Sequence, residues 1–152
     1  FLKSPIDFAR VSSSFGNRKH PISGKWKKHK GTDYAAATGT KIMTTASGTV
    51  THASRKGGYG NCVIIKHNDK YSTLYAHLSK YKKGVRKGSY VKQGDIIGYV
   101  GNTGRSQAPH LHYEVRKDKR RVNPINFYYG NLTPDEFDEL LKIASQENQS
   151  LD

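Results

Sequence analysis

The chain has 152 residues, and its 26 Lys and Arg against 12 Asp and Glu give a formal net charge of +14. This length suits one domain with its own core, and no stretch has the apolar length of a membrane span. The single cysteine, Cys62, excludes an intramolecular disulfide and a zinc site built from thiolates, and we expect it to be a small packed side chain. The charge predicts attraction to a polyanion, but the basic residues are scattered and no nucleic-acid-binding motif accompanies them, so we expect no specific nucleic-acid partner.

The start of the chain carries no visible signal peptide. It begins at Phe1 rather than at a methionine, and its first eight residues already read as ordered structure. We therefore expect a processed or excised portion of a longer protein, from which localisation signals have been removed.

Residues 1 to about 127 have the sequence pattern of an all-β protein, because short β-branched or aromatic runs alternate with turns rich in Gly, Asn, Asp and Lys. Residues 48–78 predict three strands, connected by "KGGYG" and "HNDK". Residues 88–104 predict two more short strands hinged on glycine, and a further strand follows at residues 108–115.

The end of the chain changes character. In residues 133–146, Thr133 suits a helix N-cap, Pro134 the first helical position and Glu136 a capping box, and an apolar stripe follows. We therefore divide the chain into a domain at residues 1–130 and a C-terminal helix with its tail at residues 131–152.

The predicted strand "APHLHYEV" places two histidines on one face. Alternation along an extended chain puts His110, His112 and Glu114 on one side and Leu111, Tyr113 and Val115 on the other. The apolar side can pack against a core, whereas the histidine side needs a chemical reason. A lone H-x-H pair is more often two satisfied histidines, so the rest of the chain must decide.

A second group of potential ligands lies upstream in "KKHKGTDYAAATGT". His29 and Asp33 are four residues apart and bracket Gly31, which suits a loop that turns into a strand. An imidazole and a carboxylate placed in this way can bind one divalent cation, since zinc accepts both donors. This spacing is a weak signal alone, and the later H-x-H motif makes it much stronger.

The motifs "HKGTD", "YAHL" and "PHLHYEV", in this order, resemble the zinc metallopeptidases of the M23 family, of the lysostaphin and LytM type. The resemblance covers roughly residues 4–127. It implies a mainly β fold, with an antiparallel β-sheet of the LytM-like, duplicated-hybrid-motif type. Because members of the family cut peptide bonds in peptidoglycan, it also implies a place in the bacterial cell envelope, periplasmic or secreted.

The resemblance also implies roles for five residues. His29, Asp33 and His112 would hold one Zn²⁺ per chain, and His77 and His110 would be the two unligated catalytic histidines. Three protein ligands leave one position of a tetrahedral ion open, as in catalytic zinc sites. One histidine would accept a proton from water and the other would orient the water or stabilise the oxyanion, and the sequence leaves this choice open.

Candidates for substrate binding come from two loops. Asn17, Arg18 and His20 belong to a segment that resembles the first active-site loop of the family, although a purely structural turn explains them equally well. Arg105 and Ser106 follow glycines that suit tight turns close to the cleft.

The remaining polar residues receive simpler interpretations. Glu114 is either an acceptor for an imidazole N–H or an ordinary acid at the end of a strand. His52 and His67 have no partner motif and are predicted to be surface residues. Strand alternation predicts a shared face that looks into the cleft for four residues, Tyr71, Thr73, Tyr75 and His77.

These motifs predict a zinc-dependent endopeptidase that hydrolyses the peptide cross-links of peptidoglycan, with "GNTGR" and "PHLHYEV" favouring a D,D-endopeptidase. Its partners would be stem peptides and cross-bridges, and an upstream autoinhibitory segment is possible in a longer protein. The alternative is a latent or regulatory LytM-type module, for example an amidase activator, which the presence of all five residues disfavours. A lipoyl or biotinyl carrier, suggested by "VKQGDIIGYV", needs no metal triad, so the histidines disfavour it.

Overall fold

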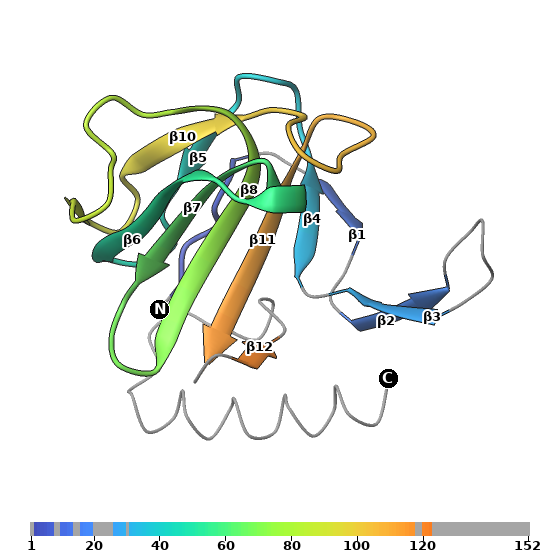
Figure 1. Cartoon of the computed structure of the whole chain (residues 1–152), viewed down its shortest axis with the longest axis horizontal. Coiled ribbons are helices and arrows are strands. Elements are labelled where there is room, and N and C mark those ends of the chain that lie inside the picture. The colour runs from blue at the N-terminus through green and yellow to red at the C-terminus, as the bar shows by residue number, and fades with distance from the viewer. Residues whose placement is uncertain are drawn as a thin grey trace.

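Strands make up almost all of the secondary structure in the described part of the chain, as a computed structural model shows (Figure 1). The structure describes residues 2–7, 10–13, 16–19, 26–29, 31–117 and 120–122. The elements in this part of the chain are β1 (Arg10–Ser13), β2 (Gly16–Lys19), β3 (Trp26–His29), β4 (Thr32–Ala35), β5 (Lys41–Met43), β6 (Gly48–Arg55), the 3₁₀ helix η1 (Gly57–Tyr59), β7 (Asn61–Lys66), β8 (Tyr71–Tyr81), β9 (Tyr90–Val91), β10 (Ile96–Val100), β11 (His110–Lys117) and β12 (Arg120–Val122).

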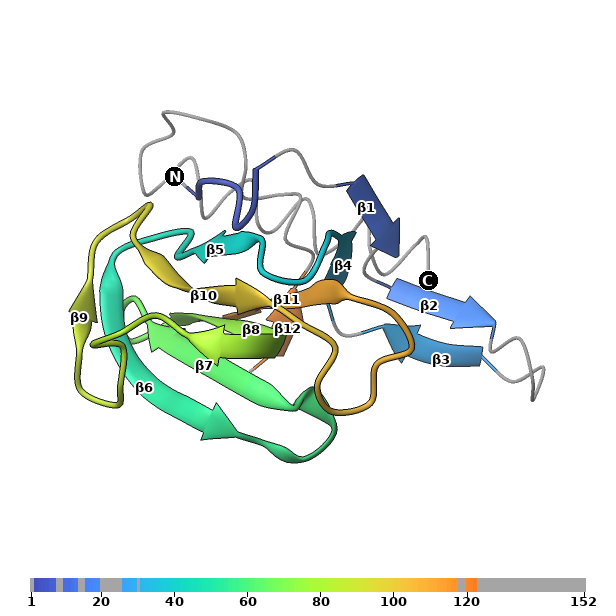
Figure 2. The same ribbon diagram turned by 90° about the horizontal axis from the view of Figure 1, so that it is seen from above.

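Ten of these strands form one antiparallel sheet in the order β1-β4-β11-β8-β7-β6-β9. β12 pairs with β11, and β10 pairs with both β5 and β8, whereas β2 and β3 form a separate hairpin. β5 and β10 therefore fold back over one face of β7 and β8, as the view from above shows (Figure 2). The predicted mainly β, antiparallel fold is confirmed, and the predicted C-terminal helix lies outside the described residues.

The strands predicted for residues 48–78 are confirmed as β6, β7 and β8. The "KGGYG" connection contains η1, and "HNDK" forms a tight turn in which Asn68 Oδ1 accepts hydrogen bonds from the backbone N–H groups of Lys70 and Tyr71, both at 2.8 Å. Such a bond from an Asn side chain to the following backbone stabilises the turn locally. The short strands predicted next are β9 and β10, and the histidine strand is β11.

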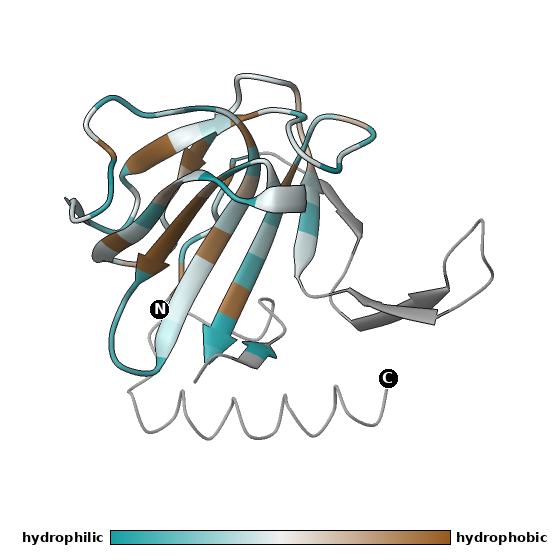
Figure 3. Cartoon of the chain, viewed as in Figure 1, coloured by the Kyte–Doolittle hydropathy of each residue, from teal (hydrophilic) through white to brown (hydrophobic). Residues whose placement is uncertain are grey.

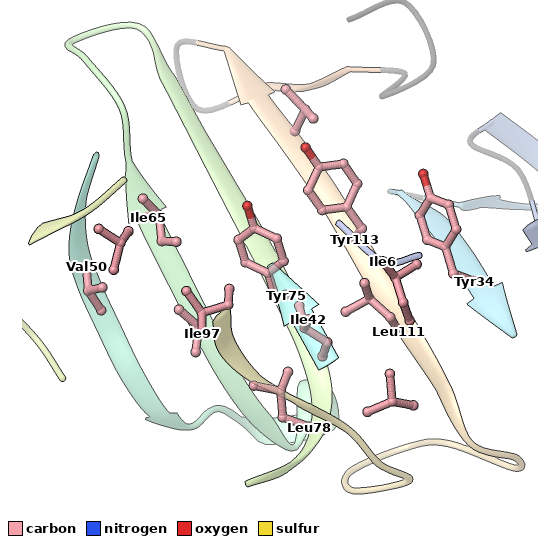
Figure 4. Packing of buried hydrophobic residues seen from close by; sticks show 14 residues of the cluster. Ile6, Tyr34, Ile42, Val50, Ile65, Tyr75, Leu78, Ile97, Leu111 and Tyr113 are labelled. Carbon is pink, nitrogen blue, oxygen red and sulfur yellow. The ribbon is translucent and has the colours of Figure 1, made fainter. Parts of the chain in front are cut away.

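The main core lies between the folded-back strands and the inner face of the sheet (Figure 4). Hydrophilic and hydrophobic residues alternate along β11, so only one of its faces joins this core (Figure 3). Tyr75 and Tyr113 are fully buried, with ring centroids 5.3 Å apart. Their hydroxyls meet Thr45, whose Oγ1 lies 2.8 Å from Tyr113 Oη and whose N–H donates to Tyr75 Oη at 3.0 Å, so the buried oxygens are satisfied.

The predicted common face for four residues of β8 is wrong. Thr73 and Tyr75 are buried on the core side rather than facing a cleft. His77 leaves that face because its backbone has a φ of +66°, and the pairing of β7 with β8 shifts register at the same level. This bulge places both Tyr75 and Leu78 in the core and leaves His77 facing the opposite side.

The prediction that His67 is a surface residue is also wrong. Its Nδ1 lies 2.8 Å from the Ser47 carbonyl and its Nε2 lies 2.7 Å from Thr73 Oγ1. Because burial disfavours the charged ring, the pKa of His67 is lowered despite the hydrogen bond to Ser47. His67 is thus a structural residue that ties the turn before β8 to the segment before β6.

Cys62 is a packed side chain, as predicted. It is fully buried with Leu74 and Ala76 in a second apolar cluster, against which Tyr59 and Ile64 pack. Burial raises the pKa of the Cys62 thiol to about 12. Since the thiolate is the reactive species, we expect no iodoacetamide modification of the folded protein and full modification in denaturant, as measured by intact mass. Modification at equal rates in both conditions would contradict this prediction.

Candidate metal centre and catalytic histidines

Three adjacent strands of the sheet bring the candidate catalytic residues together. The register pairs His112 of β11 with Asp33 of β4 on one side and with Ala76 of β8 on the other. His77 follows Ala76, and the bulge turns it toward β11. The sheet thereby assembles side chains that lie far apart in the sequence.

His112 lies between two carboxylates. Its Nδ1 is 2.7 Å from Asp33 Oδ1, and its Nε2 is 2.9 Å from Glu114 Oε2. Burial lowers the pKa of His112, but hydrogen bonds with Asp33 and Glu114 and the charges of both outweigh burial and raise it to about 9. This position therefore favours positive charge, and an imidazole nitrogen with a carboxylate oxygen is a donor pair that a divalent cation accepts.

His110 has one ring nitrogen fixed by the loop before β11. Its Nδ1 lies 2.8 Å from the Ala108 carbonyl and 3.0 Å from Ser106 Oγ. Because a carbonyl can only accept, Nδ1 carries the hydrogen and Nε2 is the acceptor of the neutral ring. His110 Nε2 lies 3.9 Å from Asp33 Oδ1, so this acceptor is directed at the Asp33–His112 pair.

His77 is fixed in a similar manner. Its Nδ1 donates to the Thr103 carbonyl at 2.6 Å, and its ring centroid lies 4.7 Å from that of His110 and 6.1 Å from that of His112. Burial lowers the pKa of His77, the two neighbouring histidines lower it further, and the Thr103 carbonyl opposes them. His77 is therefore held neutral, with Nε2 as its acceptor nitrogen.

Two loops that hold these histidines interlock. Arg105 N–H donates to the Gly58 carbonyl at 2.8 Å, and Thr103 Oγ1 accepts from Asn61 N–H at 3.0 Å. A Cβ on Gly104, which has a φ of +74°, would lie 2.3 Å from the backbone nitrogen of Gly60. Only glycine permits this approach of the "KGGYG" turn to the loop that supplies the Thr103 carbonyl to His77.

The remaining predicted site residues are only partly described. His29 is the last residue of β3, opposite Gly16 in β2, and its side chain lies outside the described structure. Among the described side chains, no three His, Cys, Asp or Glu residues form a group that could hold a metal ion. The structure brings Asp33 and His112, two of the three predicted ligands, into contact, and the ligand set as a whole remains a prediction.

Only two of the five predicted substrate contacts, Arg105 and Ser106, have described side chains. Asn17 and Arg18 lie on β2 without described side chains, and His20 lies outside the described residues. Arg105 is exposed on the loop, whereas Ser106 contacts the ring of His110 and therefore supports a catalytic candidate.

Three residues around the site were not predicted from the sequence. Tyr59, Arg116 and Arg121 surround Glu114, which is fully buried beside His112 rather than an exposed acid at the end of a strand. Alternation along β11 could have found Arg116, which is two residues beyond Glu114. Nothing in the sequence pattern signals Tyr59 or Arg121, because they reach the site from η1 and β12.

Comparison with known proteins identifies the family. Residues 27–124 match peptidase family M23, and the chain belongs to this family. The DD-carboxypeptidase/endopeptidase Mpg of Neisseria meningitidis is 49% identical over 126 residues, which cover 83% of this chain and 29% of Mpg. The chain therefore spans less than a third of the length of this relative.

Solved structures of the family have the same fold. A crystal structure of a zinc-containing peptidase from Vibrio cholerae is 39% identical with a TM-score of 0.76, covering 81% of this chain and 38% of that one. The catalytic domain of lysostaphin from Staphylococcus simulans is 34% identical with a TM-score of 0.70, covering 78% and 91%. The resemblance drawn from the motifs is thereby confirmed. Within the described residues, no helix combines the length and hydrophobicity needed to span a membrane.

Proposed function

We propose that this chain is a zinc-dependent endopeptidase domain that hydrolyses peptide cross-links of bacterial peptidoglycan. The observation that carries the proposal is the Asp33–His112 donor pair, with the acceptor nitrogen of His110 directed at it and neutral His77 alongside. The names of Mpg, a DD-carboxypeptidase/endopeptidase, and of the DD-endopeptidase ShyC of Vibrio cholerae, which is 46% identical over 125 residues, support a D,D-endopeptidase.

In this proposal His29, Asp33 and His112 hold one zinc ion. The Asp33 carboxylate and Nδ1 of His112 already lie 2.7 Å apart, and Nε2 of His112 is hydrogen-bonded to Glu114. A carboxylate oxygen and an imidazole nitrogen are both donors that zinc accepts, so the donor chemistry fits the metal. When bound, zinc polarises the scissile carbonyl and makes a water molecule more acidic.

The two remaining histidines, His77 and His110, carry out the proton transfers in this proposal. Because His77 and His110 both present an acceptor Nε2, together they can bind both hydrogens of the attacking water. One of them takes the proton as a general base and then returns it to the leaving amine as a general acid. The other keeps the water oriented toward the carbonyl. Their fixed Nδ1–H groups make this arrangement available before substrate binds.

The wider setting follows from the same proposal. The domain would act in the cell envelope, periplasmic or secreted, where a chain with a net charge of +14 is attracted to anionic murein. Residues 1–130 would form the peptidase domain and residues 131–152 a helix and tail. Asn17, Arg18, His20, Arg105 and Ser106 remain the proposed substrate contacts, and an upstream segment of a longer protein would regulate access to the site.

The test is digestion of intact sacculi by the purified protein. We expect the zinc-loaded protein to convert cross-linked muropeptide dimers to monomers, as measured by mass spectrometry, and the new termini identify the bond. Chelated protein should be inactive, and added zinc should restore the activity, because the site depends on the metal. Unchanged dimers with zinc-loaded, folded protein would overturn the proposal in favour of a latent or regulatory module.

A further inference from the structure

The carboxylate of Glu114 is unusual because it is a charge with no exposure to solvent. It lies on β11 between His112 and Arg116, on the face opposite the main core. Removing a carboxylate from water is strongly unfavourable unless charged or hydrogen-bonding partners replace the water. The surroundings of Glu114 therefore have to supply those partners.

Each oxygen of Glu114 faces donors from two residues. Oε2 accepts from the Tyr59 hydroxyl at 2.7 Å and lies 2.9 Å from His112 Nε2. Oε1 accepts from Arg116 Nε at 3.1 Å and from Arg121 Nε at 3.2 Å. Three neighbouring residues thus direct hydrogen-bond donors at this carboxylate, in addition to the ring nitrogen of His112.

Because two guanidinium groups and a hydroxyl donate to the oxygens of Glu114, these oxygens act as acceptors, so the nitrogen of His112 that faces them must carry the hydrogen. In the neutral ring this leaves the lone pair on Nδ1, which is the nitrogen that faces Asp33 at 2.7 Å. Tyr59 restrains the ring further, because it stacks on His112 with centroids 5.8 Å apart and an interplanar angle of 28°. Orientation and tautomer of His112 are thereby both determined by its surroundings.

We propose that Glu114 is a positioning residue that fixes His112 with Nδ1 as its metal-binding nitrogen, and that Tyr59, Arg116 and Arg121 hold Glu114 for this task. The inference rests on the proposed function in one respect, because it takes His112 to be a metal ligand. Carboxylates that accept the second N–H of a metal-binding histidine raise its basicity and restrict its rotation. The four residues come from η1, β11 and β12, so three elements converge on one imidazole.

The substitution Glu114→Gln tests this directly because it keeps the shape. Both arginines can only donate, so the amide oxygen of the new side chain must face them, and its amide nitrogen, also a donor, then faces His112 Nε2. That arrangement favours the tautomer of His112 with its hydrogen on Nδ1. A protonated Nδ1 has no lone pair with which to bind a metal. We expect zinc affinity to fall about 10- to 100-fold, as measured by competition with a chromophoric chelator.

Two further variants separate positioning from stability. Tyr59→Phe keeps the stacked ring but removes the hydroxyl donor, and should weaken zinc binding in the same direction by a smaller factor. Asp69→Asn removes an exposed carboxylate that lies 3.8 Å from Lys66 Nζ, and should leave zinc affinity unchanged. If Glu114→Gln does not fold, Tyr59→Phe decides: an unchanged zinc affinity in that folded variant would overturn the proposal.

Nitrogen-15 NMR of the histidine rings in the zinc-loaded protein provides the second readout. The wild type should show a metal-bound Nδ1 of His112 and a slowly exchanging hydrogen on Nε2. In Glu114→Gln and Tyr59→Phe we expect this hydrogen to exchange rapidly. Unchanged exchange and unchanged affinity in folded Glu114→Gln, with only a lower unfolding midpoint, would make Glu114 a purely structural residue. A wild-type His112 that binds no zinc would instead refute the ligand set of the proposed function, so the two failures are distinguishable.

Discussion

Replacing His112 by alanine should remove zinc and hydrolytic activity together, whereas replacing His110 by alanine should leave zinc bound and still abolish most activity. The difference follows from geometry. His112 Nδ1 lies against Asp33 Oδ1 at 2.7 Å, while His110 Nε2 lies 3.9 Å from the same oxygen and its Nδ1 is held by the Ala108 carbonyl. Since general acid–base groups contribute about 10²- to 10⁴-fold, the His110→Ala variant should lose activity by a factor in this range.

Metal analysis of the purified variants, together with digestion of sacculi, measures both effects. Asp33→Ala should behave like His112→Ala, because it removes the other described donor of the pair. His52→Ala is the matched control, since His52 contacts Ser54 on β6 and should retain both zinc and activity. If His110→Ala lost zinc and His112→Ala retained it, His110 would be the metal ligand and His112 the unligated catalytic histidine.

The sequence predicts β11 well because its chemistry and its periodicity agree. Apolar residues alternate with polar ones from His110 to Arg116, so the core face and the histidine face are both correct. The same rule fails on β8, where it places His77 on the face of Thr73 and Tyr75. A single residue with positive φ reverses the alternation, and no local pattern in "YSTLYAHL" indicates that histidine would adopt it.

The setting of Glu114 could be predicted only in part. Alternation places it beside His112, which left two interpretations open, and the structure shows the carboxylate bonded to the imidazole. Its other partners, Tyr59 and Arg121, come from separate elements and depend on how η1 and β12 dock against β11. Contacts of this kind depend on the assembled sheet and leave no spacing in the sequence.

Gly31 is the position between His29 and Asp33 where any side chain should be harmful. A Cβ there would lie 2.2 Å from the carbonyl oxygen of Tyr113 and 2.9 Å from Cγ of Glu114. The obstacle is the backbone of β11 directly opposite the start of β4, since Thr32 pairs with Tyr113. An added methyl group must therefore push β4 away from β11 and separate Asp33 from His112.

We expect Gly31→Ala to lower the free energy of unfolding by about 1–3 kcal/mol and to weaken zinc binding at the same time. Alanine reduces the conformational freedom of the unfolded chain and by itself would stabilise the protein by about 0.4–1 kcal/mol, so a net loss reports the clash. Urea unfolding of the chelated protein measures the first effect, and chelator competition measures the second. Gly58→Ala is the control for stability, because its Cβ would meet only the flexible Arg105 side chain, at 3.3 Å, and should change the free energy by less than about 0.5 kcal/mol. If Gly31→Ala matched the wild type in both measurements, the close approach of β4 to β11 would not be what holds Asp33 against His112.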